Sequence, residues 1–353
     1  MPDMGPRTER LSEYVQDTNR PLIIGACPRS GTTLLRTMLD SHPEMGVPRE
    51  TRFVFEAWER RRQFGDLTVR QNRRKLAHWI FRRRRTRWRV LDVDREEAIK
   101  RLIDAPPTLG SLLATCFVMY SEKHGKARWG DKRPTYVTRM RAIWDLFPNA
   151  QFINVVRDPR ACVASMRKLG WYFGDVAPAA ELWERCIKSA NSWSRKLAAD
   201  QLLEVKYEDI VTDPQGTLAR VTRFAGLSAE PAALADMLRY YEDEEVSQNE
   251  RHVNVSRALD ETRIGKWAGE LDEDEVAFVE RVTGAHMEQY GYASVANGVT
   301  PPSKLLRVFR SRRRANAAAW MSTVAHDRVR KLVTHRHPLA AEPTVQSGMP
   351  ASR

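Results

Sequence analysis

The 353-residue chain contains few glycines, prolines and cysteines, and it has no long apolar run. With 18 Gly and 19 Pro it is not collagen-like, and with 4 Cys it is not a small disulfide-stabilised scaffold. A hydrophobic content of 42% excludes a fully disordered chain. No stretch approaches the ~20 apolar residues that a transmembrane helix needs, and the first residues, MPDMGPRTER, lack the apolar core of a secretory signal. We therefore expect a folded cytoplasmic protein.

The four cysteines stand singly, so none belongs to a Cys-x-x-Cys pair of the kind that binds zinc. In a reducing cytoplasm we expect free thiols at all four positions, Cys27, Cys116, Cys162 and Cys186. The sequence therefore predicts no metal site.

Basic residues are concentrated in two segments. Residues 60–89 contain 12 Arg and 1 Lys against 1 Asp, and residues 301–353 contain 11 basic and 2 acidic residues. Because the whole chain carries +13, the remaining residues carry −8. The two segments are either solvated helical faces or surfaces that attract an anionic partner. We expect an acidic substrate, an anionic inner-membrane surface or a second copy of the chain, and not nucleic acid, because no nucleic-acid-binding motif accompanies the charge.

Short apolar strands alternate with amphipathic helices from residue 21 to residue 227. Buried strands are predicted over residues 21–27, 151–156 and 202–207. Helices are predicted over residues 32–42, 160–169 and 217–227. This alternation predicts an α/β fold with a central parallel sheet and helices on both faces.

The chain divides into four parts by composition. Residues 1–20 form an N-terminal segment, and residues 21–293 form the main domain, which includes an Arg-rich helical insertion at 60–89. Residues 294–337 form a basic helical extension, with the helix itself at 303–334. Residues 338–353 are predicted to be a disordered tail.

A glycine-bounded loop, Gly25-Ala-Cys-Pro-Arg-Ser-Gly31-Thr-Thr33, joins the first predicted strand to its helix. A strand–loop–helix unit of this kind offers backbone N–H groups and the positive end of a helix to a phosphate or sulfate group. The loop differs from a Walker A motif because five residues separate the glycines and Thr32 stands where the lysine belongs. The positively charged side chain of this loop is instead Arg29, two residues before the second glycine. Because the Walker lysine is missing, the loop argues against hydrolysis of ATP or GTP.

A second candidate anion site follows the strand at 151–156. Arg157 lies at the carboxyl end of this strand, and Ser165 lies eight residues later in the next helix. A guanidinium group offers a forked, charge-assisted donor and a serine offers a hydroxyl, so the pair can bracket one phosphate.

Together these motifs resemble those of the sulfotransferases that use 3′-phosphoadenosine 5′-phosphosulfate (PAPS), and most closely the tyrosylprotein branch and its bacterial relatives. PRSGTTLLRTMLDSHPEM is similar to the loop that binds the 5′-phosphosulfate group. The resemblance covers residues 21 to about 292. It implies a P-loop NTPase-like three-layer sandwich. It also implies that the 5′ end of the nucleotide contacts Arg29, Ser30, Gly31, Thr32 and Thr33, and that the 3′-phosphate contacts Arg157 and Ser165. Tyr207 and Lys266 are further nucleotide contacts that the resemblance implies, with residues 251–260 as part of a lid over the nucleotide.

The resemblance also implies the reacting groups. In PRETRFVFEAW, Glu50 corresponds to the general base of the tyrosylprotein branch, and Arg52 lies beside the acceptor. In GDKRP, Lys132 corresponds to the lysine that contacts the transferred sulfuryl group, and Arg29 assists it. Small-molecule sulfotransferases use a histidine as base, but none of His42, His78 and His124 lies in a motif of that kind.

The sequence therefore predicts a PAPS-dependent sulfotransferase that acts by in-line transfer onto a hydroxyl of a carbohydrate, lipid-linked glycan, phenol or peptide, without a metal. The animal tyrosylprotein enzymes are Golgi proteins with a membrane anchor and disulfides, which we do not expect here, and the insertion at 60–89 is unlike that branch. A bacterial-type soluble enzyme fits better, and a tyrosine acceptor does not follow. The alternatives are a P-loop kinase that uses ATP, and a non-enzymatic protein that binds anions or nucleic acid.

Overall fold

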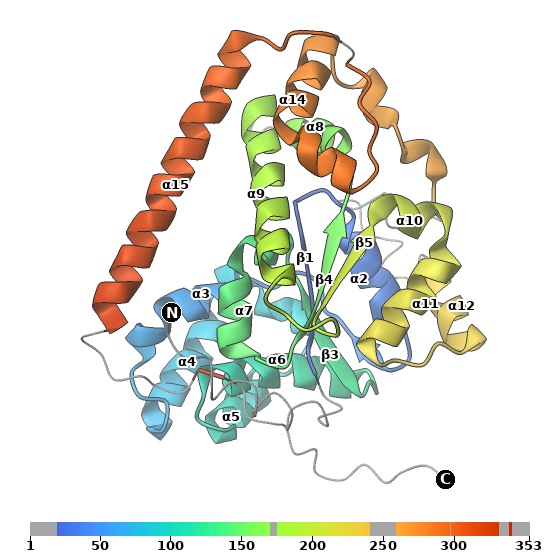
Figure 1. Ribbon diagram of the computed structural model, residues 1–353. Helices are drawn as coiled ribbons and strands as arrows, with labels where there is room; N and C mark the ends of the chain where they lie inside the picture. The colour runs from blue at the N-terminus through green and yellow to red at the C-terminus, as the bar shows by residue number, and fades with distance from the viewer. Residues whose placement is uncertain (1–19, 170–174, 241–258, 297, 332–338, 341–353) are drawn as a thin grey trace.

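A five-stranded parallel sheet forms the centre of the computed structural model, which describes residues 20–169, 175–240, 259–296, 298–331 and 339–340 (Figure 1). The strand order is β2-β3-β1-β4-β5. The strands are β1 (Leu22–Ala26), β2 (Met45–Gly46), β3 (Arg128–Lys132), β4 (Gln151–Val156) and β5 (Leu202–Lys206). Because all of them are parallel, their carboxyl ends lie at one edge of the sheet.

β1 is buried along its whole length because helices cover both faces of the sheet. Leu22, Ile24 and Ala26 belong to the core on one face, whereas Ile23 belongs to the core on the other. The register pairs Ile24 with Ile153, so the same alternation continues into β4.

Four helices cover the first face: α2 (Thr32–Asp40), α10 (Tyr207–Thr212), α11 (Pro214–Ala225) and α12 (Pro231–Leu238). The side chain of Asp213 caps α11 by accepting from the N–H of Gly216, and Gly226 ends the helix with φ +66°.

Five helices and one 3₁₀ segment cover the second face: α6 (Leu109–Lys123), η4 (Pro134–Arg139), α7 (Met140–Leu146), α8 (Pro159–Arg167), α9 (Val176–Ser194) and α14 (Glu273–Gln289). Aromatic rings fill the space between α6 and the sheet. Phe117 stacks on Trp129 of β3 at 5.2 Å and on Phe53 at 5.4 Å between ring centroids.

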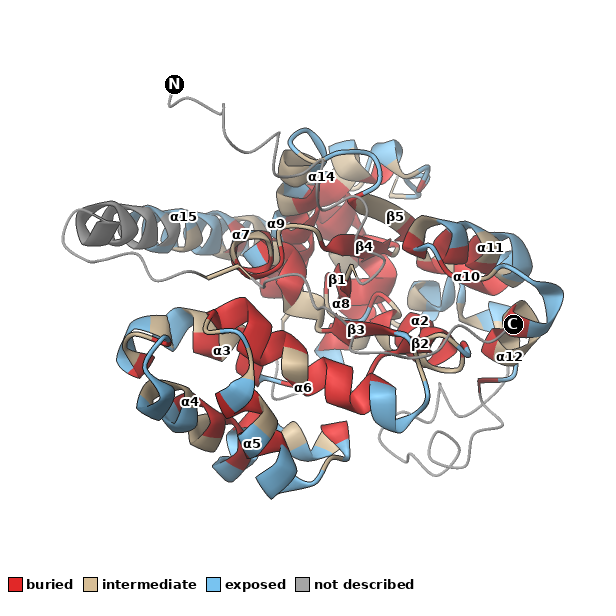
Figure 2. Cartoon of the chain, turned by 90° about the horizontal axis from the view of Figure 1, so that it is seen from below, coloured by how far each residue is buried: buried red, intermediate tan, exposed pale blue. Residues whose placement is uncertain are grey.

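The crossover from β2 to β3 carries a helical layer beside the sheet, seen at the lower left of Figure 2. It contains α3 (Phe53–Arg60), η1 (Arg61–Phe64), α4 (Arg70–Arg82), η2 (Arg84–Thr86), η3 (Trp88–Leu91) and α5 (Arg95–Asp104), followed by α6. α4 buries Leu76, Ala77, Ile80 and Phe81, and most of its arginines lie on the outer face. The Arg-rich segment is thus a packed layer with a cationic surface.

The basic helix α15 (Ser303–Lys331) follows α14 and extends along one side of the molecule (Figure 1). Phe309 attaches it to the core, where its ring meets Phe278 of α14 edge-on at 6.0 Å. Within the predicted tail, the carbonyl of Leu339 accepts a hydrogen bond of 2.7 Å from the N–H of Gly110, so the chain returns to α6 there. The other residues of the tail, and residues 1–19, lie outside the described part, and the predicted domain boundaries stay a prediction.

The three predicted strands and the parallel sheet are confirmed, but β2 and β3 were not predicted. β3 has the sequence RWGDK, which is too polar to be recognised as a strand although all five residues are buried. None of the described helices is both long and apolar enough to span a membrane.

Candidate active site

In the loop between β1 and α2, two residues have a positive backbone φ angle. Arg29 has φ +74°, which is uncommon for a residue with a side chain, and Gly31 has φ +91°. A Cβ at Gly31 would overlap Cδ2 of Tyr207, so only glycine fits between the loop and this ring. No side chain caps the N-terminus of α2, which leaves backbone N–H groups there to bind an anion.

The structure brings the second predicted anion site directly against this loop, because β1 and β4 are neighbours in the sheet. Nη1 of Arg157 donates to the carbonyl of Arg29 at 3.0 Å, and Nε of Arg29 donates to Oγ of Ser165 at 2.9 Å. The guanidinium of Arg157 lies over the ring of Tyr207, 4.1 Å from its centroid. Residues from three distant segments of the sequence therefore form one cluster, which we call the nucleotide cluster: Arg29, Arg157, Ser165 and Tyr207.

This cluster is positively charged and incompletely paired. Burial lowers the pKa of Arg29, and the nearby charge of Arg157 lowers that pKa further. Among the described residues, no carboxylate lies within ion-pair distance of either guanidinium. Nε of Arg157 is buried without a hydrogen-bond partner. An unpartnered guanidinium donor beside a second guanidinium fits a phosphate group, and thus fits the nucleotide of PAPS.

The predicted base and the predicted sulfuryl-binding lysine also lie together. Lys132, at the carboxyl end of β3, donates from Nζ to Oε2 of Glu50 at 3.3 Å and to Oγ1 of Thr33 at 3.5 Å. Burial lowers the pKa of Lys132, and the charge of Glu50 opposes this shift. The side chain of Lys132 is 6% exposed and that of Glu50 28%. The carboxylate is therefore more exposed to solvent than the lysine.

Two residues that the sequence did not single out hold the segment before Glu50. The guanidinium of Arg36 donates to Oδ2 of Asp40 and to the carbonyl of Val47, both at 3.1 Å. Oδ1 of Asp40 accepts from the N–H of Val47 at 2.8 Å. These contacts attach the chain after β2 to the last turn of α2. The spacing of seven residues between Asp40 and Val47 matches no local motif, so sequence reasoning could not identify Arg36 and Asp40.

A buried carboxylate, that of Asp131, lies next to Lys132 in the sequence but on the other face of the sheet. Asp131 accepts a hydrogen bond from the hydroxyl of Tyr136, and its Oδ1 has no partner. Burial raises the pKa of Asp131 to about 6. Because alternate residues of a strand point to opposite faces, Asp131 supports η4, whereas Lys132 points towards α2.

Two further predicted site residues, Lys266 and Arg52, contact neither the nucleotide cluster nor the pair Glu50–Lys132 among the residues described. Lys266 is exposed at the start of η8 (Lys266–Gly269) and has no hydrogen bond or ion pair to any residue that the structure describes. Its neighbour Trp267 stacks on the guanidinium of Arg160, 4.0 Å from the ring centroid, which attaches η8 to α8. Most of the predicted lid, residues 251–258, lies outside the described residues. Arg52 is exposed, and its N–H donates to the carbonyl of Thr86 at 3.0 Å.

The histidines named in the sequence lie in other surroundings. Nε2 of His42 bonds to the carbonyl of Ser228 at 2.9 Å, and Nδ1 of His124 to that of Tyr120 at 2.8 Å. His78 lies on α4. Glu50 therefore remains our candidate for the base.

Comparison with known proteins gives a consistent result. Residues 21–231 match the profile described as the Sulfotransferase family. The chain is 26% identical over 345 residues to the protein-tyrosine sulfotransferase of Drosophila melanogaster, which covers 91% of this chain and 63% of the fly protein. It is 27% identical over 302 residues to protein-tyrosine sulfotransferase 2 of Gallus gallus, which covers 82% of this chain and 74% of the chicken protein. The chain thus spans less than two thirds of the fly protein.

Two solved structures have a similar fold. The sulfotransferase domain of the Synechococcus PCC 7002 olefin synthase superposes with a TM-score of 0.54 at 23% identity, covering 78% of this chain and 96% of that domain. The sulfotransferase domain from the curacin biosynthetic pathway gives 0.52 at 21% identity, covering 78% and 99%. These likenesses confirm the predicted α/β fold.

Proposed function

The chain belongs to the Sulfotransferase family, and we propose that it transfers a sulfuryl group from PAPS to a hydroxyl acceptor and releases adenosine 3′,5′-bisphosphate. The observation that carries this proposal is the contact between the two anion-binding motifs. Arg29 and Ser165 are 136 positions apart in the sequence but are hydrogen-bonded to each other, and Arg157 joins them through the carbonyl of Arg29.

In this proposal the loop residues Ser30, Gly31, Thr32 and Thr33 hold the 5′ end of the nucleotide, together with Arg29. Arg157 and Ser165 hold the 3′-phosphate. The ring of Tyr207 stacks against the guanidinium of Arg157 and so orients it. Bound PAPS supplies the sulfuryl group. The resemblance alone assigns Lys266, at the start of η8, to the nucleotide.

In this proposal Glu50 is the general base, and Lys132 stabilises the negative charge of the transferred group. Oε of Glu50 accepts the proton of the acceptor hydroxyl, which makes that oxygen a nucleophile. Nζ of Lys132 donates to the charge that develops on the transferred group, assisted by Arg29 and by N–H groups at the start of α2. The buried position of Lys132 strengthens this interaction because little water screens it.

We propose a phenolic hydroxyl, as in a tyrosine-containing peptide, as the first acceptor to test. The support is the likeness to protein-tyrosine sulfotransferases over most of the chain. A carbohydrate, a lipid-linked glycan or a small phenol is the alternative result of the same assay.

The proposal is tested by calorimetric titration of the protein with adenosine 3′,5′-bisphosphate and, separately, with ATP and magnesium. We expect tight binding of the bisphosphate and weak binding of ATP, because the loop lacks the Walker lysine. Transfer of ³⁵S from labelled PAPS to a tyrosine peptide, 4-nitrophenol and an oligosaccharide then identifies the acceptor class. Preferred binding of ATP, or absence of bisphosphate binding by folded protein, would contradict the proposal.

A further inference from the structure

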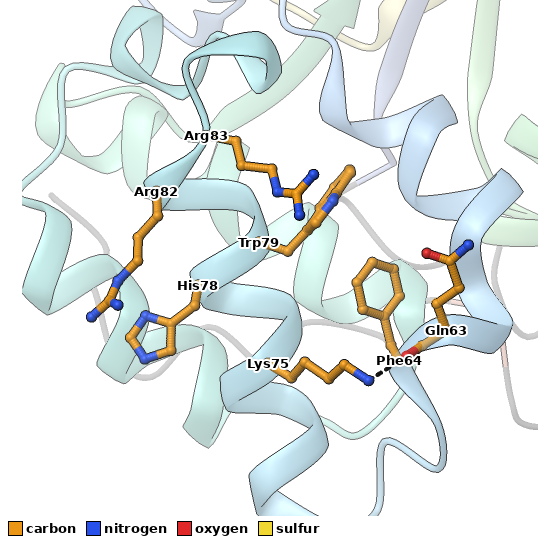
Figure 3. Close-up of a pocket in the computed structure, with 7 residues that line it drawn as sticks. All are labelled: Gln63, Phe64, Lys75, His78, Trp79, Arg82 and Arg83. Carbon is orange, nitrogen blue, oxygen red and sulfur yellow. Dashed lines mark hydrogen bonds between the residues drawn. The ribbon is translucent and has the colours of Figure 1, made fainter.

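A pocket of about 440 Å³ lies on the helical layer, formed by residues outside the candidate active site. Figure 3 shows its lining, which comes from η1, α4 and the residue that follows α4. The lining residues are two aromatic rings, four cationic or titratable side chains and one amide: Phe64, Trp79, Lys75, His78, Arg82, Arg83 and Gln63. The volume falls within the ~300–1,000 Å³ that is common for small-molecule sites.

The aromatic part of the pocket is held rigidly. The rings of Phe64 and Trp79 meet edge-on with centroids 5.4 Å apart. Nζ of Lys75 donates to the carbonyl of Gln63 at 2.6 Å, which fastens η1 to α4. Figure 3 shows Phe64 and Trp79 facing the same space, with the guanidinium of Arg83 beside the Trp79 ring. A planar ligand can stack on one of these rings and meet the other edge-on.

The charged part of the pocket has no acidic counterpart. The lining contains no Asp or Glu, and within the part of the chain that the structure describes, neither Arg82 nor Arg83 has an ion pair. Nδ1 of His78, beside Arg82, is buried without a hydrogen-bond partner. By contrast, Arg70 at the start of the same helix pairs with Asp104 at 2.7 Å, and Arg85 lies 3.6 Å from Glu56. In Figure 3 the guanidinium of Arg83 lies beside the aromatic rings, whereas Arg82 extends with His78 on the other side of α4.

We propose that this pocket is a second binding site, distinct from the candidate active site, for a small aromatic anion, namely an aryl ester of sulfate or phosphate. The ring would stack on Trp79 and meet Phe64 edge-on. The anionic oxygens would accept charge-assisted hydrogen bonds from Arg83, and the charge of Arg82 at the pocket wall would add to the attraction. This proposal does not depend on the proposed sulfuryl transfer, because no lining residue belongs to that machinery.

The test is calorimetric titration of the full chain, both without and with excess adenosine 3′,5′-bisphosphate, so that it also holds if the bisphosphate does not bind. The probes are phenyl sulfate, phenyl phosphate, inorganic sulfate and phenol. We expect one of the two phenyl esters to bind with a stoichiometry of one, and phenol and inorganic sulfate to bind at least about tenfold more weakly, because each lacks one half of the recognition. Comparison of the two esters identifies the anion.

Matched surface variants locate the site. Arg82→Gln/Arg83→Gln should weaken binding of the phenyl ester by about tenfold or more. Arg84→Gln/Arg87→Gln removes the same charge from exposed positions outside the lining, and should change the affinity less than about twofold. Trp79→Leu should weaken the phenyl esters but not inorganic sulfate.

Three results would overturn the proposal: no binding of either ester, equal binding of inorganic sulfate, or equal losses in the two arginine pairs. All four arginines are exposed, so both pairs should keep the thermal midpoint of the parent protein, and the comparison does not depend on Trp79→Leu folding.

Discussion

The cations of the candidate active site are oriented by contacts with neutral or backbone groups. Arg29 donates to a serine hydroxyl, Arg157 donates to a carbonyl and stacks on Tyr207, and only Lys132 faces a carboxylate. Side chains that are already oriented lose little entropy when an anion binds, and their charge is not neutralised in advance. Each group can therefore be tested by a single substitution.

Replacing the base candidate should abolish most of the turnover while leaving nucleotide binding intact. For Glu50→Gln we expect the rate of sulfuryl transfer to fall by about 10²–10⁴-fold, because the amide cannot accept the hydroxyl proton. The affinity for adenosine 3′,5′-bisphosphate should change less than threefold as an order-of-magnitude expectation, since Glu50 contacts Lys132 and not the nucleotide cluster. Glu59→Gln, at an exposed position of α3, is the matched control. Unchanged turnover in a folded Glu50→Gln enzyme would exclude this base.

A methyl group at Gly31 should damage the anion site specifically. Gly31→Ala places a side chain at φ +91° and against the ring of Tyr207. Gly125→Ala has comparable backbone strain at φ +66°, but its Cβ would meet nothing within 4 Å. We expect each variant to lose about 1 kcal/mol of unfolding free energy from the backbone alone. Only Gly31→Ala should weaken bisphosphate binding by calorimetry, and equal affinities for both variants would refute the role of the Gly31–Tyr207 contact.

At the scale of elements, β3 shows how one strand can serve both faces of the sheet. Lys132 points to the candidate site, whereas its neighbour Asp131 is buried against Tyr136. Burial of a carboxyl group with one unpartnered oxygen costs free energy when the group is charged.

The stability of the protein should therefore depend on the ionisation of Asp131. Its pKa is raised from 3.8 to about 6 in the fold, so the folded state binds the proton more tightly than the unfolded chain. The contribution of this group to stability is then largest at acidic pH and is lost as the pH rises to about 6. Asp131→Asn removes this dependence and keeps an acceptor for Tyr136.

We expect the gain in unfolding free energy of Asp131→Asn over the parent to be about 1 kcal/mol greater at pH 7.5 than at pH 5, by denaturant titration. Asp236→Asn removes an exposed carboxylate of α12 and is the control, with no such difference between the two pH values. A gain that is independent of pH would show that Asp131 is not the titrating group.

The sequence predicted those elements whose hydrophobic pattern is continuous, and those site residues that lie in a recognisable motif. β1, β4 and β5 are apolar runs, and Arg29, Arg157 and Ser165 follow two of them. β3 was missed because its polar residues are buried through tertiary contacts, such as that of Arg128 with the carbonyl of Ala225. Arg36 and Asp40 were missed for the same reason, since their partners become neighbours only after folding.

At the scale of the whole molecule, α15 is joined to the body near its N-terminal end. Phe309 is 6% exposed and meets Phe278 of α14, whereas the residues around it are mostly exposed. Among the side chains of α15 that the structure describes, only Phe309 is buried, so this part of the helix depends on that contact for its order.

Removing this contact should free α15 without unfolding the sheet. For Phe309→Ala we expect the local opening free energy of α15 to fall by up to about 3 kcal/mol, because a buried ring is lost. Hydrogen exchange with mass spectrometry should show lost protection in 303–319 and unchanged protection in β1 and β4. Arg310→Ala, an exposed neighbour, is the control. Protection lost equally in the sheet would mean that α15 supports the core as a whole.

The Arg-rich layer is inserted between β2 and β3, and this has a consequence for how the protein can be altered. The residues proposed to bind the nucleotide follow mainly the central strands β1 and β4, while the helical layer leaves and rejoins the sheet at its β2–β3 end. The donor half and the layer are thus modules with separate attachment points. A chimera that exchanges residues 53–104 for the corresponding segment of another sulfotransferase should keep its affinity for adenosine 3′,5′-bisphosphate. Its preference among acceptor molecules should change.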